Sequence, residues 1–366
     1  MHDALHPGVA VELNTIGEEQ PRESTDALRA EQGATAAARG VGTPRWPLPR
    51  WIDWAVGFKV VSLSMDAVCL DPGDRRHDAP FNTVVRGLIG QRLRDLRCLT
   101  RAATCTGCPE TSRCDYAAVF DRRLTATESD GEADEVPPFW LQGLPAGRTL
   151  ARGAQLSIRL HVTGQAVGVL PYLDVACRDA LVHVGMRPSA SVVHSTDLRA
   201  LTHEPIANTL RITARSPLRL RGDMSRSRRD CPAVPWFAQL VRSGVRRLDR
   251  LRMAFGEPGD RPYLEMPALG DVEVVSEQGD SMRSWRDTRK GVPLTGLIGS
   301  AVVAGEGVRR LVPLMRVLTI TNVGKATTMG FGDLTIEELP DTRRRGRPLD
   351  TTTSSSDHAL WPLATE

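Results

Sequence analysis

The chain has 366 residues, of which 41% are hydrophobic, and this is enough for two ordinary domains with a core in each. A formal net charge of only +3 excludes a uniformly basic, histone-like protein. There is no run of about 20 apolar residues and no signal-peptide pattern at the start of the chain, so we expect a cytoplasmic protein that does not enter a membrane.

Both ends of the chain lack sustained hydrophobic periodicity. Residues 1–48 are rich in Ala, Gly, Glu and Arg, and residues 340–366 combine an arginine run with a Thr and Ser tract. Such segments offer little apolar surface for a core, so we expect both to be mobile tails. Two folded domains are then expected between the tails, at residues 49–206 and 207–339.

The first of these domains has an incomplete pattern of alternating strands and helices. Hydrophobic spacing predicts strands at residues 59–70, 156–162 and 191–194, and helices at residues 83–98 and 167–180. A cysteine-rich stretch and an acidic loop interrupt this order after the first helix. We interpret the region as an approximate copy of the clearer pattern in the second domain.

Four cysteines in the interrupting stretch, Cys98, Cys105, Cys108 and Cys114, lie within 17 residues. Four thiolates can complete a tetrahedral shell around zinc, and a Cys-x-x-Cys pair gives the tight turn that such sites favour. An odd total of seven cysteines also fits reduced thiols better than a disulfide framework. We predict a structural zinc site, with an iron–sulfur cluster or unligated core thiols as the alternatives. A closed site of this kind would brace the insert without catalysing a reaction.

The second domain shows the clearest order. It predicts strand, helix, two strands, helix and strand, which is the βαββαβ order of a ferredoxin-like domain. The predicted segments are 210–220, 236–255, 271–275, 294–303, 308–318 and 334–339. The sequence therefore predicts an α+β fold of tandem ferredoxin-like (RRM-like) βαββαβ domains with a four-cysteine insert.

Arginine is concentrated in the second domain. Between Arg215 and Arg252 there are 11 arginines and three acidic residues, which favours a local site for a polyanion. In the helix predicted at 236–255, four arginines lie off the apolar stripe: Arg242, Arg246, Arg247 and Arg250. The planar guanidinium pairs well with phosphate and stacks on bases, so we expect RNA binding here. The alternative is an ordinary solvated helix face.

A glycine-rich loop follows the last predicted helix, in the stretch 321–332. Gly324, Gly330 and Gly332 surround Lys325, and such glycines let backbone N–H groups approach a phosphate. It is not a Walker loop, because Thr319 and Ala326 stand where that motif needs glycine and Ser or Thr. A simple tight turn into an edge strand remains the alternative.

Several of these stretches together resemble the CRISPR precursor-RNA processing endoribonucleases of the RAMP superfamily. The resemblance runs in order from about residue 59 to residue 339 and becomes specific only when the motifs are taken jointly. The motifs are Arg86-Gly87-Leu88-Ile89-Gly90, Cys105-Thr106-Gly107-Cys108-Pro109 with Cys114-Asp115-Tyr116 and Phe120, Ser216-Pro217-Leu218-Arg219-Leu220, Gly296-Leu297-Ile298-Gly299, Pro313-Leu314 and the glycine-rich loop.

The resemblance implies tandem ferredoxin-like domains that bind the repeat-derived stem-loop of CRISPR precursor RNA. It also implies cleavage without a metal, in which the RNA 2′-hydroxyl attacks the adjacent phosphate and leaves a cyclic phosphate and a 5′-hydroxyl. The protein would stay on the 3′ stem-loop of the mature crRNA, beside other RAMP subunits of an effector complex. No cofactor for catalysis is expected.

Such chemistry needs a base, an acid and a cation on the phosphorane. Lys325 is our candidate cation, and His77 is our candidate for proton transfer because related RNases place catalytic groups between the first strand and first helix. His161 and His183 lie in or near apolar segments and are expected to be core or boundary residues. The candidate RNA-binding residues are Gly324, Lys325, Gly330, Phe331, Gly332, Arg215, Arg219, Arg221, Arg246, Arg247 and Arg250.

Two departures from the family pattern leave a rival interpretation open. Asn322 stands where many relatives carry a histidine, and Trp285 to Lys290 replaces a segment that often contains tyrosine. The rival is a non-catalytic RAMP subunit that binds crRNA within an effector complex. A zinc enzyme acting on a small phosphate ester is a third class, but no His-Glu-x-x-His motif supports it.

Overall fold

The computed structural model describes residues 59–70, 81–102, 104–120, 136–144, 150–202, 207–220, 236–256, 264, 266–286 and 293–339. These residues all belong to one compact unit, Leu48–Glu366. The predicted tails, His77 and Arg221 lie outside the described residues. Their predicted roles therefore stay predictions.

The first sheet and its helices form a ferredoxin-like module. Its elements are β1 (Lys59–Cys69), α2 (Phe81–Arg97), β2 (Phe139–Gln142), β3 (Gln155–Val162), α4 (Leu170–His183), β4 (Met186–Pro188) and β5 (Val192–Asp197). The strand order is β2-β3-β1-β4, β5 also pairs with β1, and every pairing is antiparallel. Hydrophobic periodicity misses β2 because its four residues are all buried and show no alternation.

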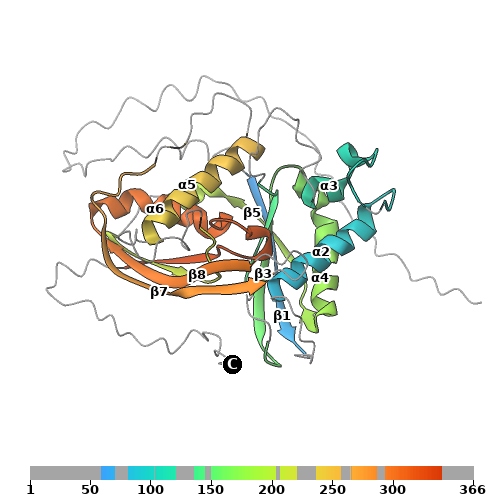
Figure 1. Cartoon of the computed structure of the whole chain (residues 1–366), viewed down its shortest axis with the longest axis horizontal. Coiled ribbons are helices and arrows are strands. Elements are labelled where there is room, and N and C mark those ends of the chain that lie inside the picture. Colours follow the sequence, from blue (N-terminus) through green and yellow to red (C-terminus); the bar gives the residue numbers. More distant parts are fainter. Residues whose placement is uncertain are drawn as a thin grey trace, which may run out of the picture. The chain divides into compact units, whose positions relative to one another are not determined.

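The two faces of this first sheet differ in chemistry. Leu63, Met65 and Ala67 of β1 are buried in a core that includes Val85 and Ile89 of α2. Each of the larger of these side chains contributes about 1.5–3 kcal/mol relative to an exposed one. Figure 1 shows α2 and α4 side by side against the sheet. The intervening β1 residues 62, 64 and 66 are polar and point to the opposite face, because successive side chains of a strand alternate.

The second module repeats the βαββαβ order predicted from the sequence. Its elements are β6 (Thr209–Ala214), α5 (Trp236–Phe255), β7 (Glu273–Arg286), β8 (Pro293–Ala304), α6 (Glu306–Thr321) and β9 (Leu334–Leu339). The strand order is β7-β8-β6-β9, with antiparallel pairing throughout. The prediction of tandem ferredoxin-like modules is confirmed.

Short helical turns complete the described chain. They are η2 (Thr111–Arg113) and α3 (Asp115–Phe120) in the cysteine insert, η4 (Gly164–Val169) before α4, η5 (Leu198–Thr202) after β5, and η6 (Thr327–Met329) in the glycine-rich loop. Within the described residues, no helix has both the length and the apolar character needed to cross a bilayer.

Helix α5 is buried over a wider arc than its apolar stripe predicts. Arg247, which we expected to be exposed with the other arginines, is only 6% exposed. Its Nε donates to the carbonyl oxygen of Thr321 at 2.6 Å, and its guanidinium lies over the ring of Trp140, 5.5 Å from the ring centroid. The prediction was wrong because the end of α6 and strand β2 cover this side of α5.

Candidate functional site

The glycine-rich loop connects α6 to β9 and depends on left-handed backbone conformations. Gly324, Gly330 and Gly332 have φ angles of 83°, 78° and 79°. A Cβ at Gly324 would lie 2.4 Å from the carbonyl oxygen of Arg219, and one at Gly332 would lie 2.0 Å from that of Val323. The turn therefore requires glycine at both positions, whatever else the loop does.

The loop is held by main-chain hydrogen bonds to the segment that follows β6. Lys325 N–H donates to Arg219 O at 2.9 Å, and Gly332 N–H donates to Pro217 O at 3.0 Å. This pairing brings Arg219 and the exposed Lys325 together, although 106 positions separate them in the sequence. Arg215 joins the same region, because its N–H donates to Asp333 O at 2.9 Å. Three cations predicted for RNA binding thus surround one loop.

Asp333 anchors the far end of the loop from a buried position. Its Oδ2 accepts from the N–H of Gly143 at 3.2 Å and lies 3.9 Å from Nε of Arg215. Burial raises the pKa of Asp333, while the positive charge of Arg215, the Gly143 N–H and the charge of Arg159 oppose that rise. The carboxylate therefore fixes the loop and offsets part of the local positive charge.

A buried chain of hydrogen bonds runs from the first sheet to this loop. Gln142 Nε2 donates to Asn322 Oδ1 at 2.7 Å and to Thr319 O at 2.6 Å, so Gln142 Oε1 is left to accept from His161 Nε2 at 2.8 Å. His161 Nδ1 must then accept from the Ser62 hydroxyl at 2.7 Å. Every donor in this series of hydrogen bonds thus faces an acceptor.

Asn322 is the last residue in this series of hydrogen bonds. It is fully buried and has a φ of 58° at the end of α6. Its Nδ2 donates to Leu141 O at 3.0 Å and to Phe331 O at 2.9 Å. Both donors and the acceptor of the amide are in use. Asn322 is therefore a structural residue that ties the loop to β2.

His161 is likewise structural, as its apolar surroundings predicted. It is 1% exposed and stacks on Trp140 with ring centroids 5.6 Å apart. Burial lowers the pKa of His161 to about 3, and the charge of Arg159 lowers it further. The imidazole therefore stays neutral at physiological pH and is not available as a general acid.

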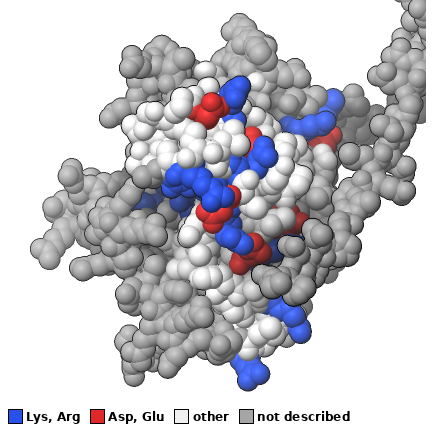
Figure 2. All heavy atoms as spheres, turned by 90° about the vertical axis from the view of Figure 1, so that its right-hand side faces the viewer, with Lys and Arg blue, Asp and Glu red and all other residues white. Residues whose placement is uncertain are grey.

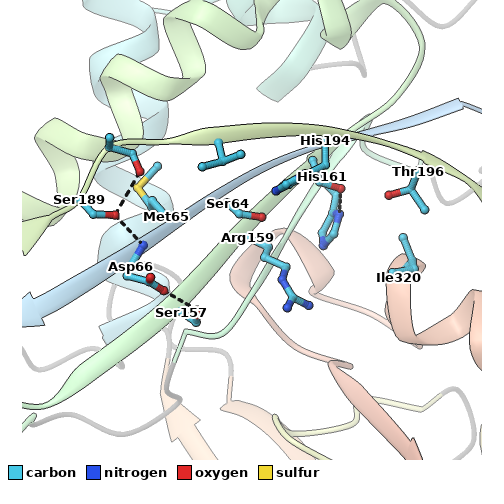
Figure 3. Close-up of a pocket in the computed structure, with 13 residues that line it drawn as sticks. Ser64, Met65, Asp66, Ser157, Arg159, His161, Ser189, His194, Thr196 and Ile320 are labelled. Carbon is cyan, nitrogen blue, oxygen red and sulfur yellow. Dashed lines mark hydrogen bonds between the residues drawn. The ribbon is translucent and has the colours of Figure 1, made fainter.

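The polar face of the first sheet borders a cavity of about 430 Å³. Figure 3 shows strands β1, β3 and β5 along it, with Ile320 of α6 on the opposite side. Its polar lining comprises Ser62, Ser64, Asp66, Ser157, Arg159, His161, Ser189, His194 and Thr196. Arg159 and His194 are exposed in it, whereas Asp66 accepts a hydrogen bond from Ser157 at 2.5 Å.

Our sequence reasoning missed this cavity. The signal that predicts it is the period of two in β1 and β3, where polar residues alternate with the buried ones. Arg159 of the cavity lies opposite Gln142 in the pairing of β3 with β2, and the next residue, Gly143, donates its N–H to Asp333 of the loop. The two polar regions are therefore neighbours.

One predicted loop residue has a different role from the one we assigned to it. Phe331 is fully buried and packs with Ala326 and Met329. Its ring is a core element of the loop and has no face open to an RNA base, so the prediction that it binds RNA is corrected. Gly330 and Gly332 are buried as well and serve the turn.

The arginines of α5 divide into two groups. Arg242 and Arg246 are exposed and Arg250 is half-buried, whereas Arg247 is buried among protein groups. Burial lowers the pKa of Arg247 to about 9, which still leaves the guanidinium charged at neutral pH. Arg247 therefore supports the helix, and the outward arginines of α5 remain the candidates for phosphate contact.

Several cations on the face of α2 and α4 already have acidic partners. Figure 2 shows Lys and Arg beside Asp and Glu on this face. Arg92 pairs with Asp179 at 2.7 Å, and Arg178 pairs with Asp174 at 3.3 Å. This mixed surface is a poorer match for a polyanion than the loop and its flanking arginines.

The four clustered cysteines are reduced and line one small cavity. Within the described residues, no three His, Cys, Asp or Glu side chains already stand in metal-binding geometry. The zinc site therefore stays a prediction.

Comparisons with known proteins match two consecutive parts of the chain. Residues 81–214 match a family model described as an N-terminal domain, and residues 212–334 match the model of the CRISPR-associated endoribonuclease Cas6. No curated protein matches the chain.

Several solved structures are similar over most of the chain. Thermus thermophilus Cas6 is 16% identical, with a TM-score of 0.44 over 76% of this chain and 99% of that one. A Cas6-related protein from Pyrococcus furiosus is 10% identical, with a TM-score of 0.38 over 76% and 99%. A partial Cas6-RT-Cas1–Cas2 complex is 11% identical, with a TM-score of 0.46 over 77% and 46%.

Proposed function

We propose that this chain, whose residues 212–334 match the family model of the CRISPR-associated endoribonuclease Cas6, is a Cas6-type RAMP protein that binds and cleaves CRISPR precursor RNA. Its substrate would be the repeat-derived stem-loop, and the mature guide RNA would stay bound. The observation that carries the proposal is the glycine-rich loop, where Lys325 and Arg219 are paired through their main chains and Arg215 lies alongside. Such a cluster suits a phosphate backbone.

The proposed reaction needs no metal. The 2′-hydroxyl attacks the neighbouring phosphorus, the bond to the 5′-oxygen breaks, and the products are a 2′,3′-cyclic phosphate and a 5′-hydroxyl. A base takes the proton of the attacking hydroxyl and an acid returns one to the leaving oxygen. Lys325 would place its ammonium against the charge that develops on the phosphorane. His77 remains our candidate for proton transfer.

The exposed groups of the sheet-face cavity extend this proposed site. Arg159 can pair with phosphate, and the neighbouring hydroxyls and His194 offer hydrogen bonds to sugar and base edges. We infer that the single-stranded RNA next to the stem enters this cavity. Cleavage at or near the 3′ base of the stem would then take place beside the loop.

A non-catalytic RAMP subunit that holds crRNA in an effector complex is the second candidate. Asn322 favours it, because this buried amide cannot replace the histidine of relatives, and the neutral His161 cannot do so either. Incubation of the purified protein with its repeat hairpin in EDTA separates the two candidates. Cut product supports the enzyme, and tight binding without product supports the subunit.

We expect the outward arginines of α5 to contribute to RNA binding by charge. Replacing Arg242 and Arg246 with Ala should weaken hairpin binding about tenfold at moderate salt and lower the slope of log K against log salt by about two. The measurement is fluorescence anisotropy over a salt series. The fold should not change, because both side chains are exposed.

The matched control is the double variant Arg92→Ala with Arg178→Ala. These two guanidiniums already pair with Asp179 and Asp174, so their loss should leave the RNA affinity and the salt slope nearly unchanged. Equal effects of the two double variants would remove α5 from the RNA interface.

A further inference from the structure

The cysteine insert brings four thiols to one enclosed space. Cys98 follows the end of α2, Cys105 and Cys108 occupy a turn, and Cys114 precedes α3. All four line a cavity of about 10 Å³, roughly the space of one water-sized sphere. Its other lining residues are threonines and alanines, so the thiols are the strongest metal ligands around it.

The backbone of the insert makes several turns beside this cavity. Cys108 N–H donates to Cys105 O at 3.1 Å, with Gly107 between them at a φ of 75°. The Thr111 hydroxyl lies within hydrogen-bond distance of the carbonyl oxygens of both Cys105 and Cys108, at 3.1 and 2.7 Å. Cys114 N–H then donates to Thr111 O at 3.3 Å. Consecutive turns thus fold the segment around the cavity.

The insert has little apolar core of its own. Helix η2 buries no residue, and Leu99, between the first cysteine and the turn, is 78% exposed. Helix α3 is anchored separately, because Phe120 packs on Phe139 with ring centroids 4.7 Å apart. None of the described residues from Cys98 to Cys114 is fully buried, so hydrophobic burial contributes little to holding them. Small segments of this kind rely on disulfides or metals.

We propose that Cys98, Cys105, Cys108 and Cys114 bind one Zn²⁺ as a closed tetrathiolate site. The ion would connect the end of α2 to the start of α3. Rotation of the cysteine side chains about χ1 would bring the sulfur atoms from the cavity wall into tetrahedral geometry. With four protein ligands the metal keeps no open position, so the site is structural and does not depend on the proposed RNA chemistry.

The test uses the full chain, purified without added metal. Elemental analysis should find about one zinc per chain, and a mercurial reagent should release it from the wild-type protein. The double variant Cys105→Ser with Cys108→Ser should lose the zinc and melt at a lower temperature. Cys231→Ser, a cysteine outside the four and outside the described residues, should keep the zinc.

A second measurement covers the case in which the double variant does not fold. Wild-type protein exchanged with Co²⁺ should show the intense sulfur-to-cobalt charge-transfer bands and visible d–d bands of a tetrahedral thiolate site. If wild-type protein without the metal melted at the same temperature as wild-type protein with zinc, the proposal would be overturned. Iron with acid-labile sulfide in place of zinc would overturn it too.

Discussion

Lys325→Ala is expected to slow cleavage of the repeat hairpin by roughly 10²–10³-fold, the usual effect of removing one group that stabilises transition-state charge. Binding should weaken far less, because the loop loses one phosphate contact among several and the salt slope falls by about one. Single-turnover cleavage rates and equilibrium binding, measured on the same RNA, separate the two effects. The fold should be unaffected, since the Lys325 side chain is exposed.

Two variants control this experiment. Lys325→Arg keeps the charge and should recover part of the rate, whereas Lys59→Ala removes an exposed lysine at the start of β1 and should change neither quantity. If Lys325→Ala reduced binding and cleavage by the same factor, the ammonium would hold RNA in the ground state only. The proposed role in the transition state would then be wrong.

Asn322→Asp should destabilise the protein by about 3–5 kcal/mol, although the two side chains have nearly the same shape. The buried amide donates to Leu141 O and Phe331 O, and a carboxylate would place negative charge against both carbonyl oxygens. Gln142 could still donate to it, which recovers only part of the loss. Denaturant unfolding at neutral pH measures the change.

Asn208→Asp makes the same substitution at a partly exposed site. There the side chain accepts a hydrogen bond from Arg309 and donates one to Glu306. The added charge gains from the first and loses at the second in an exposed setting, so it should change stability by less than about 1 kcal/mol. Asn322→His is the complementary variant, and it should lower stability without raising the cleavage rate, because the imidazole would have to be buried. A faster Asn322→His enzyme would contradict the structural role that we assign to Asn322.

Hydrophobic period and helix boundaries made most of the fold predictable. The helix at 236–255 and the strand at 334–339 have the predicted bounds, because long amphipathic segments and short strands between clear breaks carry strong local signals. Strand β2 was missed because four buried residues show no alternation. Its pairing with β3 is set by tertiary contacts, which local pattern does not report.

The site was only partly predictable. Lys325 and the glycines were conspicuous in the sequence, but the pairing of the loop with residues 215–219 depends on how β6 and β9 meet in the sheet. Arg247 had the same local signal as Arg246, and only the packing of α6 and β2 on α5 distinguishes a buried cation from an exposed one. The periodicity of a single helix does not report which of its residues another module will bury.

The most direct test of the proposed function is cleavage of two matched repeat hairpins in EDTA. One is all-RNA, and the other carries a 2′-deoxy substitution at the nucleotide before the cut. We predict that the first gives a product ending in a cyclic phosphate, and that the second binds with the same affinity but stays intact because its attacking hydroxyl is missing. Cleavage of the deoxy hairpin, or tight binding of both hairpins with no product from either, would contradict the proposed endoribonuclease mechanism.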